Sequence, residues 1–94
     1  MCGFVGFMDE LSHEKKHKSI KLMADRIIHR GPDQEGYYID NNIALGHRRL
    51  SIIDLNNGTQ PMFNEDKSIV VVFNGEIYNY QEIKKELEEK GHKF

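Results

Sequence analysis

Residues 2–7, CGFVGF, form a stretch in which glycines alternate with large apolar residues. This pattern predicts a buried strand over residues 3–8, with the backbone approached closely at Gly3 and Gly6. Residues 68–73, SIVVVF, are almost continuously apolar and β-branched, which predicts a second strand that is buried on both faces. Because helical patterns lie between and after these strands, the sequence predicts an α+β fold that forms one piece of a layered sheet domain.

Two amphipathic helices are predicted. Between Glu14 and His29 the apolar side chains recur at intervals of three and four residues, with Ser12 as the N-cap and Gly31-Pro32 as the stop signal. The second helix follows Asn79, where an N-x-x-E sequence resembles a capping box, and it ends at Gly91.

The segment between the helices is predicted to be mainly strand and turn. Residues 36–39 and 43–47 are expected to form two strands joined by a turn at residues 40–42. Residues 50–55 are another short apolar run, and a turn rich in asparagine and glycine follows it.

The composition excludes several classes of function. The chain has 94 residues, 38% of them hydrophobic and 30% charged, which allows one small domain or part of a larger one with a thin core. The net charge of −2 comes from interspersed acids and bases, so no nucleic-acid or membrane surface is indicated. We expect no signal peptide, because Asp9, Glu10 and a lysine-rich run interrupt any apolar start. We expect no membrane span, because no apolar run approaches about 20 residues. The single cysteine excludes an internal disulfide and favours a reducing, cytoplasmic location.

Cys2 is the residue with the clearest chemical potential. Methionine aminopeptidases remove Met1 when the second residue is small, so we expect the mature chain to begin with Cys2. The reference pKa is about 7.7–8.0 for an α-amine and about 8.5 for a cysteine thiol, so an N-terminal amine can be neutral at working pH and can take the thiol proton. A nucleophile with its own base needs no histidine partner. The alternative is that a cysteine at this position has no function.

Three further features suit the same chemistry. Asn74-Gly75 follows the second strand and offers a side-chain amide and a backbone N–H to a developing oxyanion, although the dipeptide also fits an ordinary turn. Arg48-Arg49 offers a bidentate clamp for a carboxylate, or else forms a solvated pair at a strand end. Glu76 can receive an ammonium group, or it is simply an acid in the first turn of a helix.

A zinc site is suggested by the spacing of residues 13–17, HEKKH, which matches the H-E-x-x-H signature. That signature belongs in the middle of a helix beneath a cleft, whereas these residues lie at a predicted helix start among lysines. No distant third ligand is evident, so we expect no metal site in this chain.

Taken together, the motifs resemble those of the class II glutamine amidotransferases, the N-terminal-nucleophile family, and within it the glutamine-hydrolysing asparagine synthetases. The resemblance runs in order from Cys2 to Phe94. The stretches that carry it are CGFVG at 2–6, RGPD at 30–33, GHRRLSIID at 46–54, QPM at 60–62 and FNGEIYNY at 73–80. Cys-Gly-x-x-Gly openings also occur in sister families with sugar acceptors, so no single stretch carries the resemblance alone.

The resemblance implies roles for six residues. Cys2 would be the nucleophile, with its α-amine as general base and later general acid, and the reaction would release ammonia from glutamine through a γ-glutamyl thioester. The remaining roles would be α-carboxylate binding by Arg49, main-chain contacts from Ile53, an oxyanion hole of Asn74 and Gly75, and lining of the substrate pocket by Glu76.

The resemblance also implies that residues 1–94 are the N-terminal half of a glutamine amidotransferase domain, because the family's domain is about twice this length. The expected fold is part of a four-layer α-β-β-α sandwich. ATP and magnesium, which would amidate aspartate to asparagine, would act in a synthetase domain that these residues do not contain. Two alternatives stay open: a sister amidotransferase with a sugar or peptide-like acceptor, and a non-catalytic fragment. A half sandwich leaves an apolar face uncovered, which favours homodimer formation.

Overall fold

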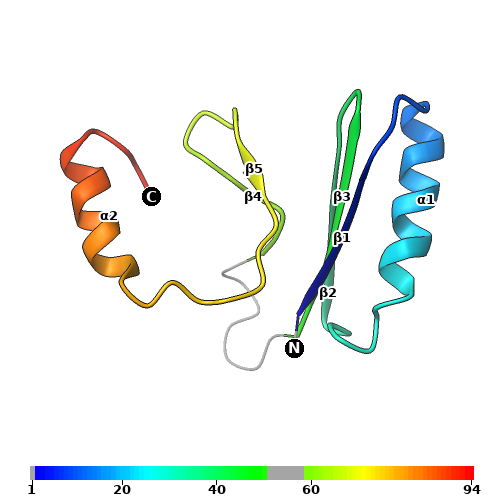
Figure 1. Ribbon diagram of the computed structural model, residues 1–94, viewed down its shortest axis with the longest axis horizontal. Helices are drawn as coiled ribbons and strands as arrows, with labels where there is room; N and C mark the ends of the chain where they lie inside the picture. The colour runs from blue at the N-terminus through cyan, green and yellow to red at the C-terminus, as the bar shows by residue number, and fades with distance from the viewer. Residues whose placement is uncertain (1, 51–58) are drawn as a thin grey trace.

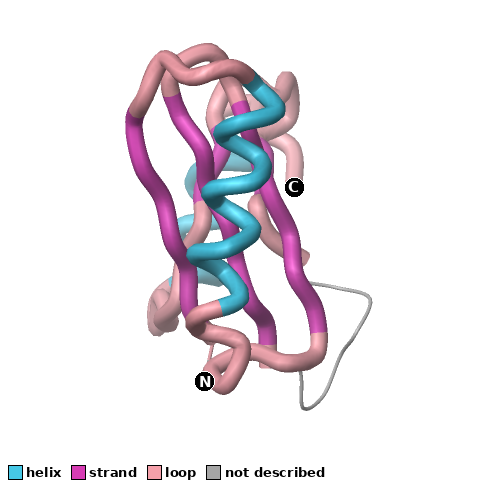
Figure 2. Tube along the Cα trace, turned by 90° about the vertical axis from the view of Figure 1, so that its right-hand side faces the viewer, coloured by secondary structure: helices cyan, strands magenta, loops and turns pink. Residues whose placement is uncertain are grey.

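The computed structural model describes residues 2–50 and 59–94. A three-stranded antiparallel sheet, in the order β1-β3-β2, carries helix α1 on one face, as Figures 1 and 2 show. A separate two-stranded sheet pairs β4 with β5, and helix α2 follows it. The elements are β1 (Gly3–Met8), α1 (His13–Asp25), β2 (Gln34–Ile39), β3 (Ile43–Arg49), β4 (Met62–Phe63), β5 (Val70–Val71) and α2 (Tyr80–Glu89). The predicted α+β class is therefore confirmed.

Helix α1 begins as its sequence predicts. The Ser12 hydroxyl accepts a hydrogen bond from the Lys15 N–H at 3.3 Å, which satisfies one of the donors left unpaired in the first turn. Ile20 is fully buried, and its side chain lies beside Gly46 of β3, where a Cβ would come within 3.2 Å of it. The helix ends at Asp25, earlier than the predicted His29, and the following residues form turns.

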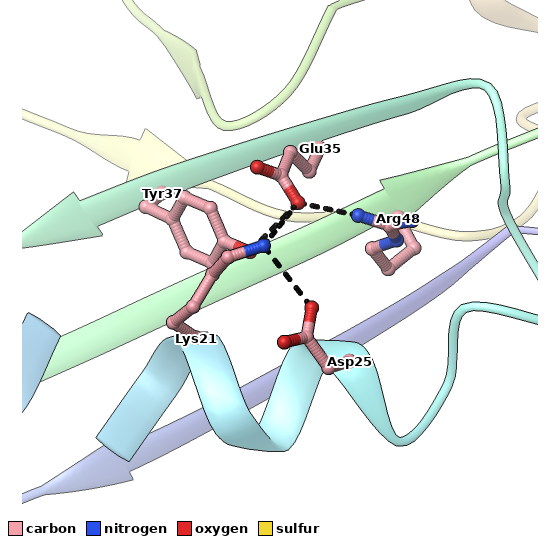
Figure 3. Close-up of polar contacts among 5 residues, drawn as sticks. All are labelled: Lys21, Asp25, Glu35, Tyr37 and Arg48. Atoms are coloured by element: carbon pink, nitrogen blue, oxygen red, sulfur yellow. Dashed lines mark hydrogen bonds and ion pairs between the residues drawn. The ribbon is translucent and has the colours of Figure 1, made fainter. Parts of the chain in front are cut away.

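A cluster of polar and charged side chains, made of Lys21, Asp25, Glu35, Tyr37 and Arg48, links α1 to the sheet (Figure 3). One oxygen of Glu35 on β2 accepts hydrogen bonds from Lys21 of α1 at 2.8 Å and from the buried Arg48 of β3 at 2.5 Å. The Tyr37 hydroxyl donates to the same oxygen at 3.2 Å. The hydrogen bond from Lys21 is the main cause that lowers the pKa of Glu35, and burial opposes it. The helix is thus held to two strands by one carboxylate.

Strand β1 departs from its prediction in burial. The strand forms over Gly3–Met8 as expected, but only the face toward α1 is covered. On the opposite face Phe4 is 52% exposed and Met8 76% exposed. The expectation of a fully buried strand is wrong, because nothing among the described residues packs as a second layer over this face of β1.

The predicted long strand over residues 68–73 is also wrong. Only Val70–Val71 pair, with Met62–Phe63 as the partner strand, and Ile69 is 65% exposed. A strand buried on both faces needs a neighbour on each side and a layer on each face. The described part of the chain gives β5 one short partner, so Val71 is exposed and Val70 only half-buried.

Helix α2 confirms the second predicted helix in its position. Asn79 is the N-cap, although its side chain makes no capping hydrogen bond, and the helix stops before Gly91, which adopts a positive φ of 96°. Among the described elements α2 packs against none of the others, and Figure 1 shows it at the opposite end of the molecule from α1. Residues 50–55 were predicted as an apolar run, and of these only Leu50 is described.

No helix within residues 2–50 and 59–94 has both the length and the apolar character that crossing a membrane requires.

Candidate functional site

The Cys2 thiol lies at the end of the three-stranded sheet, next to Leu50, the residue that directly follows β3. Its Sγ accepts a hydrogen bond from the Leu50 N–H at 3.4 Å and lies 3.8 Å from the Leu50 carbonyl oxygen. The side chain is half-buried, so it is fixed by backbone groups while remaining accessible. The residue that precedes β1 is therefore positioned by contacts across the sheet.

The main-chain carbonyl of Cys2 is held by two side chains from distant parts of the chain. Asn74 donates its Nδ2–H to this oxygen at 3.0 Å, and Arg30 donates its Nε–H at 3.2 Å. The structure thus brings Asn74 beside Cys2, with its amide N–H directed at the main-chain carbonyl of that residue. Sequence reasoning assigned Arg30 no role, and its only signal was its place in the RGPD stretch after the predicted helix.

The two neighbouring arginines point to opposite faces of the sheet. Arg48 faces α1 and pairs with Glu35. Arg49 lies on the other face, where its Nη1–H donates to Gln34 Oε1 at 2.9 Å. Continuing the register in which Gly3 pairs with Arg48 puts Cys2 opposite Arg49, and residues directly opposite one another in an antiparallel pair project to the same face. Of the two arginines, Arg49 is the one that shares a face with the thiol.

A cavity of about 240 Å³ opens beside Arg49. His47 forms part of its wall and is only 1% exposed, and its Nε2 has no hydrogen-bond partner among the described residues. Burial lowers the pKa of His47, against a weaker opposing effect from the main chain of Phe73. Because the neutral imidazole adds no charge, Arg49 is the cation among the described lining residues, and the one carboxylate among them, Glu35, is already paired with Lys21 and Arg48. The cavity beside Arg49 therefore suits an anionic group. The cavity is lined by Gln34, Glu35, Gly36, His47, Arg49, Thr59 and Gln60.

Of the remaining predicted site residues, the two that the structure describes do not contact the thiol. Gly75 and Glu76 are both exposed, and within residues 2–50 and 59–94 neither forms a hydrogen bond with Cys2. A Cβ on Gly75 would meet the Phe73 ring at 3.0 Å. Ile53 lies outside the described residues.

The H-E-x-x-H stretch sits at the start of α1, where the His17 ring lies 6.0 Å from the Tyr37 ring. In the part of the chain that the structure describes, no three His, Cys, Asp or Glu side chains gather as a metal site would require.

Chemically, this corner of the sheet combines a thiol, a primary amide that donates beside it, and a guanidinium that lines a cavity. A thiol attacks carbonyl carbon, an amide N–H stabilises an oxyanion, and a guanidinium binds a carboxylate. The arrangement therefore suits acyl transfer from a substrate that carries a carboxylate.

Comparison with known proteins agrees with this chemistry. The family model of the glutamine amidotransferase domain matches residues 1–94. Asparagine synthetase [glutamine-hydrolyzing] 1 of Bacillus subtilis (strain 168) is 48% identical over 97 residues, which is 100% of this chain and 15% of the relative. Asparagine synthetase [glutamine-hydrolyzing] 2 of the same organism is 52% identical over 90 residues, 93% of this chain and 12% of the relative. A plant relative, from Brassica oleracea, is 47% identical over 96 residues, 100% of this chain and 16% of the relative. The chain thus spans about 15% of the length of the curated relatives it matches.

Proposed function

Because this chain belongs to the glutamine amidotransferase domain family, we propose that it hydrolyses the side-chain amide of glutamine and releases ammonia. The observation that carries the proposal is the hydrogen bond that brings Asn74 to Cys2, at the end of the sheet where Arg49 lines a cavity. A thiol alone would be unremarkable, whereas a thiol beside an amide donor and a guanidinium suits an amide substrate with a carboxylate.

The reaction begins after Met1 is removed. The α-amine of Cys2 takes the thiol proton, and Sγ attacks the side-chain carbonyl carbon of glutamine. The Asn74 amide and the Gly75 N–H stabilise the oxyanion that forms. The α-ammonium then protonates the leaving nitrogen, ammonia departs, and a γ-glutamyl thioester remains on Cys2. Water, activated by the same amine, hydrolyses the thioester to glutamate and restores the thiol.

The substrate is held by its α-carboxylate at Arg49. This guanidinium donates a hydrogen bond to Gln34 and lines the cavity. We further propose that Ile53 contributes main-chain contacts and that Glu76 lines the pocket near the substrate ammonium. Those two roles rest on the family resemblance.

In the complete protein we propose that the ammonia amidates aspartate to asparagine, in keeping with the relatives, which are glutamine-hydrolysing asparagine synthetases. ATP and magnesium would serve a separate synthetase domain, as the resemblance to those relatives implies. A sugar or peptide-like acceptor is the alternative, and the acceptor domain decides between them. We place the enzyme in the cytoplasm, which suits a free thiol at its centre.

We also propose that residues 1–94 are the N-terminal half of a four-layer α-β-β-α domain. The support is the apolar face of β1, where Phe4 and Met8 lie exposed on the side away from α1. A second sheet packed there would bury them, and a homodimer contact would do the same.

Mass spectrometry of the complete protein tests the glutaminase directly. Acid quenching during turnover should give an N-terminal peptide that lacks Met1 and carries a γ-glutamyl group on Cys2. An active enzyme that keeps Met1 would rule out the α-amine as the base, and a γ-glutamyl group on any other residue would rule out Cys2 as the nucleophile.

A further inference from the structure

We propose that Gln60 is a positioning residue that holds Asn74 in place through the backbone of Phe73; this inference rests on the proposed glutaminase function. The Gln60 side chain donates its Nε2–H to the Phe73 carbonyl oxygen at 2.8 Å, and its Oε1 accepts the Phe73 N–H at 2.6 Å. A single side-chain amide therefore satisfies both backbone groups of one residue. It acts as a neighbouring strand would.

The location of this pairing matters because regular structure has already ended. The β4–β5 ladder ends at Val71, two residues before Phe73, and α2 does not begin until Tyr80. Asn74 lies in this irregular stretch, directly after Phe73, and its side chain reaches the Cys2 carbonyl at 3.0 Å. The Gln60 amide thus extends backbone pairing as far as the residue that precedes the oxyanion donor.

Gln60 is itself held against the three-stranded sheet. A Cβ added to Gly36 of β2 would lie 1.9 Å from the Gln60 carbonyl oxygen, so the backbone at Gln60 packs directly on β2. Gln60 also lines the same cavity as Arg49 and His47. The residue consequently connects the sheet that carries Cys2 and Arg49 to the segment that carries Asn74.

This geometry has a defined kinetic consequence. An oxyanion donor acts in the transition state, so its displacement lowers kcat more than it weakens glutamine binding. Misplacement of about 1 Å can cost about 10²-fold in rate. We expect Gln60→Ala in the complete protein to lower kcat for glutamine hydrolysis about 10- to 100-fold, with KM for glutamine changed less than about threefold.

The isosteric variant Gln60→Glu sharpens the test. It keeps the size of the side chain and the oxygen that accepts the Phe73 N–H. It loses the donor and sets a carboxylate against the Phe73 carbonyl, so we expect a fall in kcat at least as large as that of Gln60→Ala. Gln81→Ala is the matched control, because Gln81 is exposed on α2 and bonds only to the neighbouring Tyr80 hydroxyl among the described residues. It should retain wild-type kcat and KM.

Ammonia-dependent product formation, measured in each variant, reports whether the synthetase domain remains folded, and an unchanged KM for glutamine reports that the glutamine site does. A Gln60→Ala protein that keeps this activity and wild-type kcat for glutamine would overturn the inference. A rise in KM with unchanged kcat would also overturn it, since Gln60 would then bind substrate. A wild-type protein without glutaminase activity would instead refute the proposed function.

Discussion

At the scale of single residues, Cys2 depends on contacts from three distant parts of the chain. Leu50 holds the thiol, while Asn74 and Arg30 hold the main-chain carbonyl. None of these contacts is local in sequence, so the position of the nucleophile follows from the whole arrangement of the sheet end. Its neighbour across the sheet, Arg49, is placed by strand register.

Arg49→Ala should raise KM for glutamine while changing kcat little, because a carboxylate clamp binds ground state and transition state alike. The loss of a charged contact in a closed pocket costs about 2–5 kcal/mol. Steady-state kinetics on the complete protein measures the effect.

Arg48→Ala is the matched control for this substitution. Its guanidinium faces α1 and pairs with Glu35, so its loss should weaken the fold without a specific effect on KM. The opposite pattern, with KM raised by Arg48→Ala and unaffected by Arg49→Ala, would place the clamp at Arg48.

At the scale of elements, local patterns predicted the structure where local interactions decide it. The capping hydroxyl of Ser12 and the turn between β2 and β3 appear as expected. The burial of β1 and the length of β5 did not follow from the sequence, because both depend on layers that other segments must supply. The same limit applies to the site: Gln60 and Arg30 act through backbone groups far along the chain, and no local spacing marks such contacts.

Glu35→Gln should loosen the attachment of α1 at neutral pH. The pKa of Glu35 is lowered in the folded protein, chiefly by Lys21, so the carboxylate contributes stability above its unfolded pKa of about 4.3. That contribution is lost as the pH falls through the lower folded pKa. Because the carboxylate is partly exposed, we expect exchange of α1 amides to quicken only about two- to fivefold at pH 7.

Hydrogen exchange of the α1 amides in Glu35→Gln and wild type, measured across a range of pH, tests this effect. The difference in exchange rate between the two proteins should disappear in acid, where Glu35 is protonated. Glu86→Gln, which breaks an exposed pair with Lys90 on α2, should leave α1 unchanged. Equal exchange rates at pH 7, or a difference in exchange rate that persists after Glu35 is protonated, would contradict the assigned role of the cluster.

At the scale of the whole molecule, the described fold is extended and thinly packed. Its radius of gyration is 14.8 Å, whereas a compact domain of about 100 residues has about 13 Å. The fully buried apolar residues of the described part are few, namely Ile20, Ala24 and Ala44. Such a core is small for independent folding, which supports the proposal that these residues are half of a larger domain.

Residues 1–94 produced alone should therefore show no meaningful glutaminase activity, even with Met1 removed. Without a layer over the open face of β1, Asn74 and Cys2 should drift apart, and the exposed apolar side chains should drive self-association. Ammonia release and sedimentation measure the two effects. A soluble monomer of residues 1–94 that hydrolyses glutamine at the rate of the complete protein would contradict the half-domain proposal.

The most direct test of the central claim is Cys2→Ala in the complete protein, with product formation measured first from glutamine and then from free ammonia. In the proposed mechanism Cys2 performs only the amide chemistry, and free ammonia bypasses that step. We predict that glutamine-dependent activity disappears while ammonia-dependent activity stays close to wild type. Equal loss of both activities, or glutamine hydrolysis that survives without the thiol, would contradict the assignment of Cys2 as the nucleophile.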